Sequence, residues 1–527
     1  MLNQTLLNSV AEYAKQIQTP VTFALNTGDH SKREELRQFL TAIADTADTA
    51  DTIEFIEEAQ THLRSPISFE LRTNGQSSGI QFSGIPGGHE FNSLILALLH
   101  AGGHPMKLDP SLVHLIQAID QPLHFVTYVS LSCHNCPDIV QLLNQCAVLN
   151  PNITSEMVDG QLFQSVIDEK NIQGVPTTHL NDEPFATGKI DPSTLINKLL
   201  ERFPNLKDNA TASTEAALGI QDMTIIGGGP AGVAAAIYGA RKGLAVTLIA
   251  DRIGGQVKDT QAIENFISIP LTHGPELSNQ LRTHMNDYDI TIKEHLSVET
   301  YDTPTSAGHP HRMTLNSGEV IESKTVIVAT GARWRELNVP GEKENIGNGV
   351  AYCPHCDGPF FKGKKVAVVG GGNSGVEAAI DLSGIAEHVT VLEFLPELKA
   401  DQVLVDKMHQ TPNISVMTEV ATQAIESDDS GVNGITIAHR ATDETETLDL
   451  DGVFVQIGLL PNSGFIQEAV ETNRFGEILV NDRCETNVSG LFACGDVTNI
   501  PYKQIIIAMG HGATAALSAF DYTIRHD

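Results

Sequence analysis

The segment DMTIIGGGPAGVAAAIYGARKGLAVTLIAD, residues 222–251, decides the fold class of this 527-residue chain. It reads as an apolar strand, a G-x-G-x-x-G motif, a helix of small residues and a second apolar strand that ends at Asp251. The first glycine (Gly227) permits a tight turn, the second (Gly229) lets the backbone approach a pyrophosphate, and the third (Gly232) lets helix and strand pack closely. The segment therefore predicts a dinucleotide site at a helix N-terminus, where backbone N–H groups favour negative charge.

The same pattern occurs again in KKVAVVGGGNSGVEAAIDLSGIAEHVTVLEF, residues 364–394. This copy carries its own glycines, Gly370, Gly372 and Gly375, and ends its second strand at an acid, Glu393. A lone glycine motif is weak evidence, but each copy has the full strand–turn–helix–strand context with the acid at the expected distance. The two copies form the clearest internal repeat in the chain. They predict an α/β protein with two Rossmann-like domains, one for a flavin dinucleotide and one for a nicotinamide dinucleotide.

Two further motifs indicate which copy holds the flavin. Gly495–Asp496, in GLFACGDVTNIPYKQIIIAMGHG (490–512), resembles the second flavin motif of two-dinucleotide disulfide reductases, and ATGAR (329–333) resembles their connecting motif. Both lie outside the second copy. We therefore expect the first copy, ATGAR and Gly495–Asp496 to build an FAD domain into which a nicotinamide domain is inserted.

Glu393 predicts the choice of nicotinamide cofactor. A carboxylate at the end of the second strand accepts hydrogen bonds from the adenosine ribose and repels the extra phosphate of NADPH. Its neighbours, LEFLPELK, contain no arginine cluster. The sequence therefore predicts a preference for NADH.

Four of the seven cysteines form two C-x-x-C pairs, Cys133–Cys136 and Cys353–Cys356. A predicted strand (124–130) precedes the first pair, a helix is expected from Cys133 onward, and a Val-Pro at Pro176 precedes a later strand. This order is typical of thioredoxin folds. Pro176 is expected to be cis and to face the dithiol, since X-Pro bonds adopt cis at low cost. A Cys₄ zinc site is the weaker reading, because its pairs usually lie about 15–20 residues apart; we expect no metal.

The motifs together resemble the flavoprotein subunit of bacterial alkyl hydroperoxide reductase over essentially the whole chain. The matching stretches are CHNC (133–136), GVP (174–176), GGGPAG, YCPHCDGP, GGGNSGVEAAIDL and PYKQIIIA (501–508). The resemblance implies tandem thioredoxin-like folds followed by FAD and NADH domains of the class II pyridine nucleotide-disulfide oxidoreductase type. It also implies an enzyme that passes electrons from NADH through FAD and both dithiols to the disulfide of a peroxiredoxin. That circuit supports reduction of alkyl hydroperoxides and hydrogen peroxide.

The resemblance also implies the domain boundaries. We expect a thioredoxin-like fold without a dithiol at 1–120, a thioredoxin-like fold with C-x-x-C at 121–203, a linker at 204–219, the FAD domain at 220–340 and 459–527, and the NADH domain with the redox dithiol at 341–458. A flexible linker of this length spans roughly 20–24 Å on average. We hypothesise that it lets the N-terminal region swing between Cys353 and the outgoing partner.

Individual roles are carried over from the same resemblance. Cys356 stacks on the flavin, Cys353 exchanges with the outgoing disulfide, and Asp357 handles protons. Cys133 attacks the partner and Cys136 resolves the mixed disulfide. Glu90, within GGHEF (87–91), lies near the N-terminal dithiol.

The resemblance assigns the remaining positions to the two cofactors. Those expected at FAD are Gly227, Gly229, Pro230, Ala231, Gly232, Asp251, Gly255, Gln256, Asn265, Ala329, Thr330, Gly331, Gly495, Asp496, Lys503, Gln504 and Ile505. Those expected at NADH are Gly370, Gly372, Asn373, Ser374, Gly375, Glu377, Glu393 and Gly458.

Composition narrows the partners and the location. The formal net charge of −32 disfavours binding to nucleic acid and anionic membranes. The N-terminus lacks a signal-peptide pattern and no run of eighteen apolar residues occurs, so we expect a cytoplasmic protein. The family resemblance implies a homodimer. Two alternatives stay open: a thioredoxin reductase with a fused thioredoxin acting on general protein disulfides, and a non-enzymatic flavin-binding redox sensor.

Overall fold

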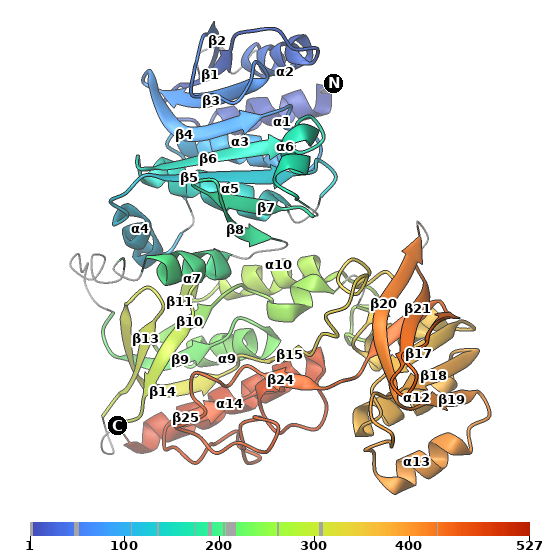
Figure 1. Cartoon of the computed structure of the whole chain (residues 1–527). Helices are drawn as coiled ribbons and strands as arrows, with labels where there is room; N and C mark the ends of the chain where they lie inside the picture. Colours follow the sequence, from blue (N-terminus) through green and yellow to red (C-terminus); the bar gives the residue numbers. More distant parts are fainter. Residues whose placement is uncertain are drawn as a thin grey trace. The chain divides into compact units, whose positions relative to one another are not determined.

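The computed structural model describes residues 4–46, 52–106, 108–133, 136–172, 174–187, 192–203, 206, 218–260, 263–304, 309–428 and 431–526. It divides into two compact units, each described here by itself (Figure 1). Unit 1 comprises Met1–Ala217 with Glu294–Ser297 and Leu315–Val320, and unit 2 comprises Leu218–Lys293, Val298–Thr314 and Ile321–Asp527. Among the described residues no helix is long and apolar enough to cross a membrane.

Unit 1 contains one eight-stranded sheet in the order β2-β1-β3-β4-β6-β5-β7-β8. Its strands are β1 (Val21–Asn26), β2 (Ile53–Glu58), β3 (Ser68–Thr73), β4 (Gln76–Ser83), β5 (Leu123–Val129), β6 (Ile153–Asp159), β7 (Thr177–Leu180) and β8 (Glu183–Thr187). Strand β1 pairs in parallel with β2 and antiparallel with β3, which pairs with β4. Strand β5 repeats this pattern with β6, β7 and β8. The chain thus builds the same unit twice, and the parallel pairing of β4 with β6 joins the two halves.

The helices of unit 1 are α1 (Gln4–Ala14), α2 (Arg33–Ala44), α3 (Glu90–Ala101), α4 (Pro110–Gln117), α5 (Cys136–Leu149), α6 (Gln164–Glu169) and α7 (Pro192–Arg202). Helix α3 of the first half packs against α5 of the second half. Both helices are rich in buried apolar residues, such as Leu94 and Leu98 on α3 and Ile139 and Leu143 on α5. Burial of this shared apolar surface therefore stabilises the two halves as one body.

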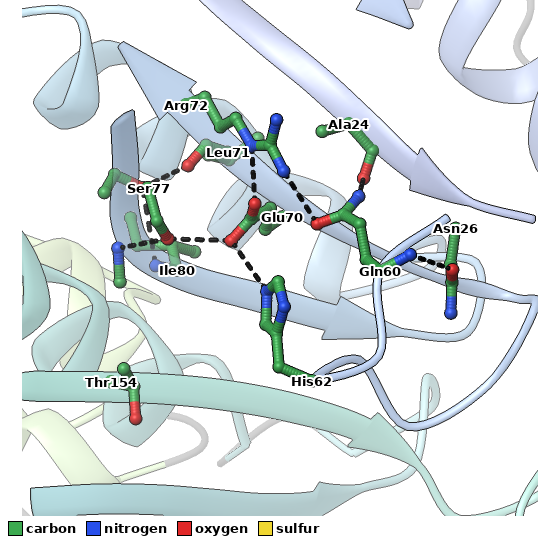
Figure 2. A network of polar contacts seen from close by, with 12 residues as sticks. Ala24, Asn26, Gln60, His62, Glu70, Leu71, Arg72, Ser77, Ile80 and Thr154 are labelled. Atoms are coloured by element: carbon green, nitrogen blue, oxygen red, sulfur yellow. Dashed lines mark hydrogen bonds and ion pairs between the residues drawn. The ribbon is translucent and has the colours of Figure 1, made fainter. Parts of the chain in front are cut away.

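A buried polar network holds the segment before β3 on the sheet (Figure 2). Glu70, only 2% exposed, accepts hydrogen bonds from Arg72 Nε at 2.5 Å and Ser77 Oγ at 2.8 Å, and it contacts His62 Nε2 at 3.2 Å. Arg72 also donates to the Gln60 side chain at 3.0 Å. Buried charges persist in proteins when they are paired and hydrogen-bonded, as Glu70 is here.

A second buried carboxylate links the two halves of unit 1. Arg64, from the first half, donates to both carboxylate oxygens of Glu156 on β6 at 2.7 and 2.6 Å. Ser83 at the end of β4 donates to the same carboxylate at 2.5 Å. Removing one partner of such a buried pair usually costs about 3–5 kcal/mol, because the other charge stays uncompensated. The Arg64–Glu156 ion pair therefore stabilises the junction of β4 and β6, where the two halves of unit 1 meet.

Unit 2 begins with a seven-stranded sheet in the order β11-β10-β9-β14-β13-β12, with β25 beside β14. Its elements are β9 (Gln221–Ile226), α9 (Pro230–Ala240), β10 (Val246–Ala250), η1 (Gly255–Asp259), α10 (Gly274–Met285), β11 (Ile290–Glu294), β12 (Val298–Asp302), β13 (His311–Leu315), β14 (Val320–Val328), β25 (Leu491–Ala493), η3 (Gly495–Val497) and α14 (Ile505–His526). Strands β10, β9, β14 and β25 run parallel, which is the expected Rossmann arrangement.

Helices α9 and α14 pack against each other more extensively than any other pair of described helices. Gly512 lies so near that an added Cβ would stand 2.0 Å from the Ala231 carbonyl oxygen. Buried alanines on α14, among them Ala515 and Ala519, keep the two backbones close. The C-terminal helix is thereby held against the first turn of α9.

A second parallel sheet, β16-β23-β17-β18-β19, is inserted between β14 and β25. The same part of the chain also forms an antiparallel sheet, β20-β21-β22. The elements of this part are β16 (Val350–Ala351), α11 (Pro354–Asp357), η2 (Gly358–Phe361), β17 (Lys365–Val369), α12 (Asn373–Ser383), β18 (His388–Leu392), α13 (Gln402–His409), β19 (Ile414–Met417), β20 (Val420–Asp428), β21 (Gly431–His439), β22 (Thr445–Asp449) and β23 (Gly452–Val455). The chain enters through β15 (Ala332–Trp334) and leaves through β24 (Leu459–Pro461), which pair antiparallel. In the sequence, the second parallel sheet thus lies between two strands of the first.

Candidate functional site

The N-terminal dithiol is a disulfide between Cys133 and Cys136, with Cα atoms 5.6 Å apart. Cys136 is buried and begins α5, whereas Cys133 is half-buried and precedes the helix. The Cys133 sulfur lies 3.9 Å from the Val175 carbonyl oxygen, and the Val175–Pro176 peptide bond is cis. The prediction that the bond before Pro176 is cis is confirmed, and the carbonyl of that bond lies beside the Cys133 sulfur.

The helix start is a correction. The sequence placed it at Cys133, but Cys133 lies outside the helix: its N–H donates to the Ser130 carbonyl at 2.9 Å in a separate turn, and the described part of α5 begins at Cys136. The intervening His134 and Asn135 lie outside the described residues.

A loop from the first half of unit 1 contacts the segment that carries Cys133. The His89 N–H donates to the Leu131 carbonyl at 3.0 Å. Gly88 adopts a positive φ of 53°, and an added Cβ there would lie 2.3 Å from the Leu131 carbonyl oxygen. Only glycine meets both conditions without strain. The first half, which has no dithiol, therefore supports the redox loop of the second half.

Glu90 follows this loop in the first turn of α3 and is fully buried. Neither carboxylate oxygen has a hydrogen-bond partner of good geometry among the described residues. Burial raises the pKa of Glu90 to about 7, Asp138 on α5 raises it further, and nearby Ser93 opposes the shift. The carboxyl group can therefore gain or lose a proton near neutral pH.

The second dithiol lies at the start of the inserted domain. Cys353 is disulfide-bonded, half-buried and forms the N-cap of α11. The Asp357 N–H donates to the Cys353 carbonyl at 3.0 Å, and burial raises the pKa of Asp357 to about 6. Cys356 lies within α11, but its side chain and that of His355 fall outside what the structure describes.

Gln504 links this dithiol to the flavin-type domain. Its Nε2 donates to the Cys353 sulfur at 3.8 Å, and its Oε1 accepts from Asn265 Nδ2 at 3.2 Å. The sequence placed Gln504 and Asn265 together among the flavin residues. It gave no signal of the contact with Cys353, because the residues lie far apart in the chain.

The two glycine loops have matching geometry. Gly227 and Gly370 have φ values of 119° and 121°, and an added Cβ would meet a carbonyl oxygen, of Ala329 or Gln456, at 2.2 or 2.4 Å. In both copies a Cβ on the third glycine would lie 1.8 Å from the carbonyl oxygen of the first. Both loops thus need glycine for the turn and for close packing of helix on strand.

The space around the middle glycine of each loop shows whether a dinucleotide pyrophosphate fits there. A Cβ added to Gly229 or Gly372 would meet no atom within 4 Å, so both positions face open space. These glycines are the N-caps of α9 and α12, and neither helix start has a side-chain capping bond. Uncapped N–H groups at a helix N-terminus bind phosphate readily. The residues present therefore fit a pyrophosphate in each copy.

Gly495 and Asp496 form a short turn, η3, beside α14. Gly495 donates its N–H to His511 Nδ1 at 3.0 Å, and its carbonyl accepts from Thr498 Oγ1 at 2.7 Å. Burial raises the pKa of Asp496, and Lys503 opposes that shift. No sequence motif pointed to His511.

Other residues predicted for the flavin surround the first loop. A Cβ on Gly255 would lie 3.1 Å from the Gly229 Cα. Gln256 donates to the Ala332 carbonyl, and Thr330 Oγ1 donates to the Asn462 carbonyl at 2.8 Å. The rest take the following places: Pro230 and Ala231 begin α9, Ile505 begins α14, Gly331 has φ 68° after Thr330, and Asp251 is exposed after β10.

Glu393 follows β18 and is 8% exposed. Its carboxylate accepts from the N–H groups of Gly371 at 2.5 Å and Leu395 at 2.7 Å. The Glu393 carboxylate therefore stabilises the second glycine loop by accepting a backbone hydrogen bond from it. A carboxylate has about four acceptor sites, so two remain for ribose hydroxyls.

The fold also brings an arginine to this position. Arg440 donates to the Phe394 carbonyl at 2.8 Å, and its guanidinium lies 3.9 Å from the centre of the exposed Phe394 ring. The sequence around Glu393 contains no arginine cluster, so this neighbour was missed. A guanidinium therefore lies beside the residue that follows Glu393.

The remaining nicotinamide positions flank the same loop. Asn373 exchanges two hydrogen bonds with Asp401, at 3.1 and 2.7 Å. Ser374 and Glu377 are exposed on α12. Gly458 has φ 107°, and its carbonyl accepts from the Arg335 N–H at 3.0 Å.

Comparison with known proteins agrees with this architecture. The family model "Pyridine nucleotide-disulphide oxidoreductase" matches residues 221–515, and a thioredoxin domain model matches 125–201. A relative from Escherichia coli (strain K12), named as a subunit of alkyl hydroperoxide reductase, is 46% identical, covering 100% of this chain and 99% of that protein. The chain is also 46% identical to "NADH dehydrogenase" of Bacillus subtilis (strain 168), covering 100% of both. Thioredoxin reductase from Streptococcus pyogenes MGAS5005 aligns with TM-score 0.55 and 34% identity, over 58% of this chain and 99% of that one.

Proposed function

Because this chain belongs to the pyridine nucleotide-disulphide oxidoreductase family, with full-length relatives named as alkyl hydroperoxide reductase subunits, we propose that it reduces the disulfide of a peroxiredoxin. It is an NADH-dependent flavin disulfide oxidoreductase. One observation carries the proposal. The chain holds one disulfide cysteine beside a flavin-type site and a separate dithiol in a thioredoxin-like unit. The first arrangement receives electrons, and the second delivers them to another protein.

The first glycine loop, Gly495–Asp496 and the Thr330 segment would hold FAD, and the second loop with Glu393 would hold NADH. Bound there, FAD would supply the hydride-accepting and disulfide-reducing chemistry of the enzyme. Asn265 orients the Gln504 amide so that its N–H faces the Cys353 sulfur. Such a donor favours the thiolate that forms when a disulfide opens.

Each dithiol needs a group that exchanges protons, because a thiolate that leaves or attacks changes its protonation. Asp357 is bonded to the Cys353 backbone and changes protonation near pH 6, so it serves the Cys353–Cys356 pair. Glu90 changes protonation near pH 7 and serves the Cys133–Cys136 pair. Cys133, the more accessible of its pair, attacks the partner, and Cys136 resolves the mixed disulfide.

Three further features belong to the proposal. Residues 1–120 and 121–203 are two thioredoxin-like folds, supported by the repeated strand pairing, and 204–219 links them to a body of FAD domain (220–340, 459–527) and NADH domain (341–458). The linker lies largely outside the described residues. We take the enzyme to be a cytoplasmic homodimer, as the resemblance to the family implies.

The test is NADH consumption in the presence of a peroxiredoxin and a hydroperoxide. We expect steady NADH loss with the wild type and faster reaction with NADH than with NADPH. Cys133→Ser should abolish this loss while NADH still bleaches the flavin. Undiminished peroxide-dependent NADH loss in Cys133→Ser would refute the proposed exit through this dithiol.

A further inference from the structure

We propose that His511 is a positioning residue for the flavin-site turn, and that it holds Gly495–Asp496 through the unprotonated Nδ1 of its imidazole. The proposal rests on the assignment of this turn to FAD. It concerns a residue that no motif in the sequence indicated. It also predicts that flavin retention depends on the protonation of one histidine.

The hydrogen bond sets the tautomer. Gly495 donates its backbone N–H to His511 Nδ1 at 3.0 Å, so Nδ1 must carry a lone pair. In a neutral imidazole with an acceptor Nδ1, the proton resides on Nε2. A protonated ring would place an N–H of its own against the Gly495 N–H. The contact therefore exists only with neutral His511.

The turn has little freedom to adjust if this bond is lost. Gly495 has a positive φ of 73°, and an added Cβ would lie 2.9 Å from the Ala231 Cβ. Thr498 holds the Gly495 carbonyl from its other side at 2.7 Å. The peptide groups of Gly495 are therefore held at two points: His511 accepts from its N–H, and Thr498 donates to its carbonyl.

His511 is itself placed rigidly. It precedes Gly512, where an added Cβ would lie 2.0 Å from the Ala231 carbonyl oxygen, so this turn of α14 is pressed against α9. The His511 carbonyl also accepts a contact from Cys484 Sγ at 3.5 Å. The imidazole is therefore presented to Gly495 from a fixed backbone.

The surroundings favour the neutral ring. Burial lowers the pKa of His511, and the positive charge of Lys503 lowers it further. Of the groups on adjoining segments, Asp496 on η3 is acidic, whereas burial raises the pKa of Cys484 and Cys494 and keeps both thiols neutral. The first turn of α9 and strand β25, both described in full, contribute no charged residue.

The direction of the pH effect follows from linkage. His511 has a lowered pKa in the folded protein and an ordinary one, about 6.5, in the unfolded chain. Its contribution is therefore fully present above about pH 6.5 and is lost as the pH falls below that value. In the folded protein the His511 ring is protonated only below its ordinary pKa, so flavin retention should weaken at acid pH and not at neutral pH.

Two substitutions distinguish the effect of losing the hydrogen bond from the effect of protonating His511. His511→Asn places an amide oxygen near the position of Nδ1 and does not titrate, whereas His511→Leu removes the acceptor at similar volume. Release of FAD from the purified holoprotein is followed by flavin fluorescence between pH 8 and pH 5. We expect the wild type to retain FAD at pH 8 and to release it only at acid pH, where His511 in the folded protein takes up a proton. His511→Asn should lose this acid dependence, and His511→Leu should bind FAD about three- to ten-fold more weakly at pH 8.

Acid release that is the same in the wild type and His511→Asn would overturn the proposal. Wild-type retention in His511→Leu at pH 8, with an unchanged far-UV circular dichroism spectrum, would do so too. Failure of the His511 proposal alone leaves a yellow wild-type protein. A wild-type protein that is colourless and binds no added FAD would instead overturn both this inference and the proposed function.

Discussion

Burial raises the pKa of two carboxyl groups that accompany the two dithiols, Glu90 in unit 1 and Asp357 in unit 2. Surface carboxyl groups are ionised at neutral pH and cannot supply a proton there. These two change protonation near pH 7 and pH 6, close to neutral pH. Each is therefore suited to proton exchange with a thiol.

Glu90→Gln should stabilise the protein in a pH-dependent way. The unfolded chain releases the Glu90 proton near pH 4.5 and the folded chain near pH 7. The folded state therefore loses stability as the pH rises between these values and stays at the lower level above about 7. The glutamine variant should gain up to about 3 kcal/mol at pH 8 and almost nothing at pH 4. Denaturant unfolding of the full chain at both pH values measures this, and equal gains would contradict the burial argument.

Asp357→Asn should change the pH dependence of the second dithiol. The wild-type rate of NADH-dependent disulfide reduction should show an inflection near pH 6, where the Asp357 carboxyl changes protonation. The variant should lack this inflection and turn over about 10²-fold more slowly, the lower range for loss of a general acid–base group. Rates measured from pH 5 to pH 8 test this. An inflection that persists in the variant would assign it to another group.

The sequence predicted the site at the residue scale only where a local motif exists. The glycine motifs, both C-x-x-C pairs and Pro176 follow from spacing along a short segment. The contact of Arg440 with Phe394 and the bond from Gly495 to His511 join segments that meet only after the chain folds. No local periodicity encodes such pairs, so only the structure reveals them.

Among the elements, the two glycine loops offer a matched pair of substitutions. An added Cβ at Gly229 or Gly372 meets no protein atom within 4 Å, so either alanine variant should fold normally. Gly229→Ala should lose FAD, because its methyl group occupies the space where the pyrophosphate approaches. Gly372→Ala should stay yellow but require at least ten-fold more NADH for half-maximal flavin reduction. Flavin content and NADH titration of both variants distinguish the two sites, and an exchange of the two results would reverse the assignment.

Gly88, in the loop before α3, and Gly75, in the turn between β3 and β4, form a second matched pair. Both have positive φ, 53° and 75°, but only at Gly88 would a Cβ meet another atom, the Leu131 carbonyl oxygen at 2.3 Å. Left-handed backbone alone costs an alanine about 1–2 kcal/mol. Gly75→Ala should therefore lower stability without altering thiol exchange at Cys133, whereas Gly88→Ala should also slow that exchange. Measuring exchange with a small disulfide checks this, and equal exchange rates would show that the loop does not position Cys133.

The elements themselves were largely predictable. The strand expected at 124–130 is β5 (Leu123–Val129), and the strand–helix–strand units at 222–251 and 364–394 are present. The start of α5 was wrong at Cys133, which lies in a turn closed by the Ser130 carbonyl and not in the helix. Helix ends depend on such individual bonds, which hydrophobic periodicity does not report.

At the scale of the whole molecule, the sequence did not predict how the two halves of unit 1 join. Their single eight-stranded sheet depends on the pairing of β4 with β6 and on the Arg64–Glu156 ion pair. Strand pairing between distant segments is not encoded by the period of either strand. The joined sheet explains why a half without a dithiol is present: it forms part of the support for the other half's redox loop.

The central claim is that electrons from NADH reach Cys133–Cys136 only through the Cys353 dithiol. The most direct measurement is anaerobic reduction of the holoprotein with NADH, followed by alkylation and mass-spectrometric counting of free thiols at each cysteine. The wild type should show Cys133 and Cys136 reduced. Cys353→Ser should bleach its flavin yet keep Cys133–Cys136 oxidised. Equal reduction of Cys133–Cys136 in the wild type and in Cys353→Ser would contradict the account.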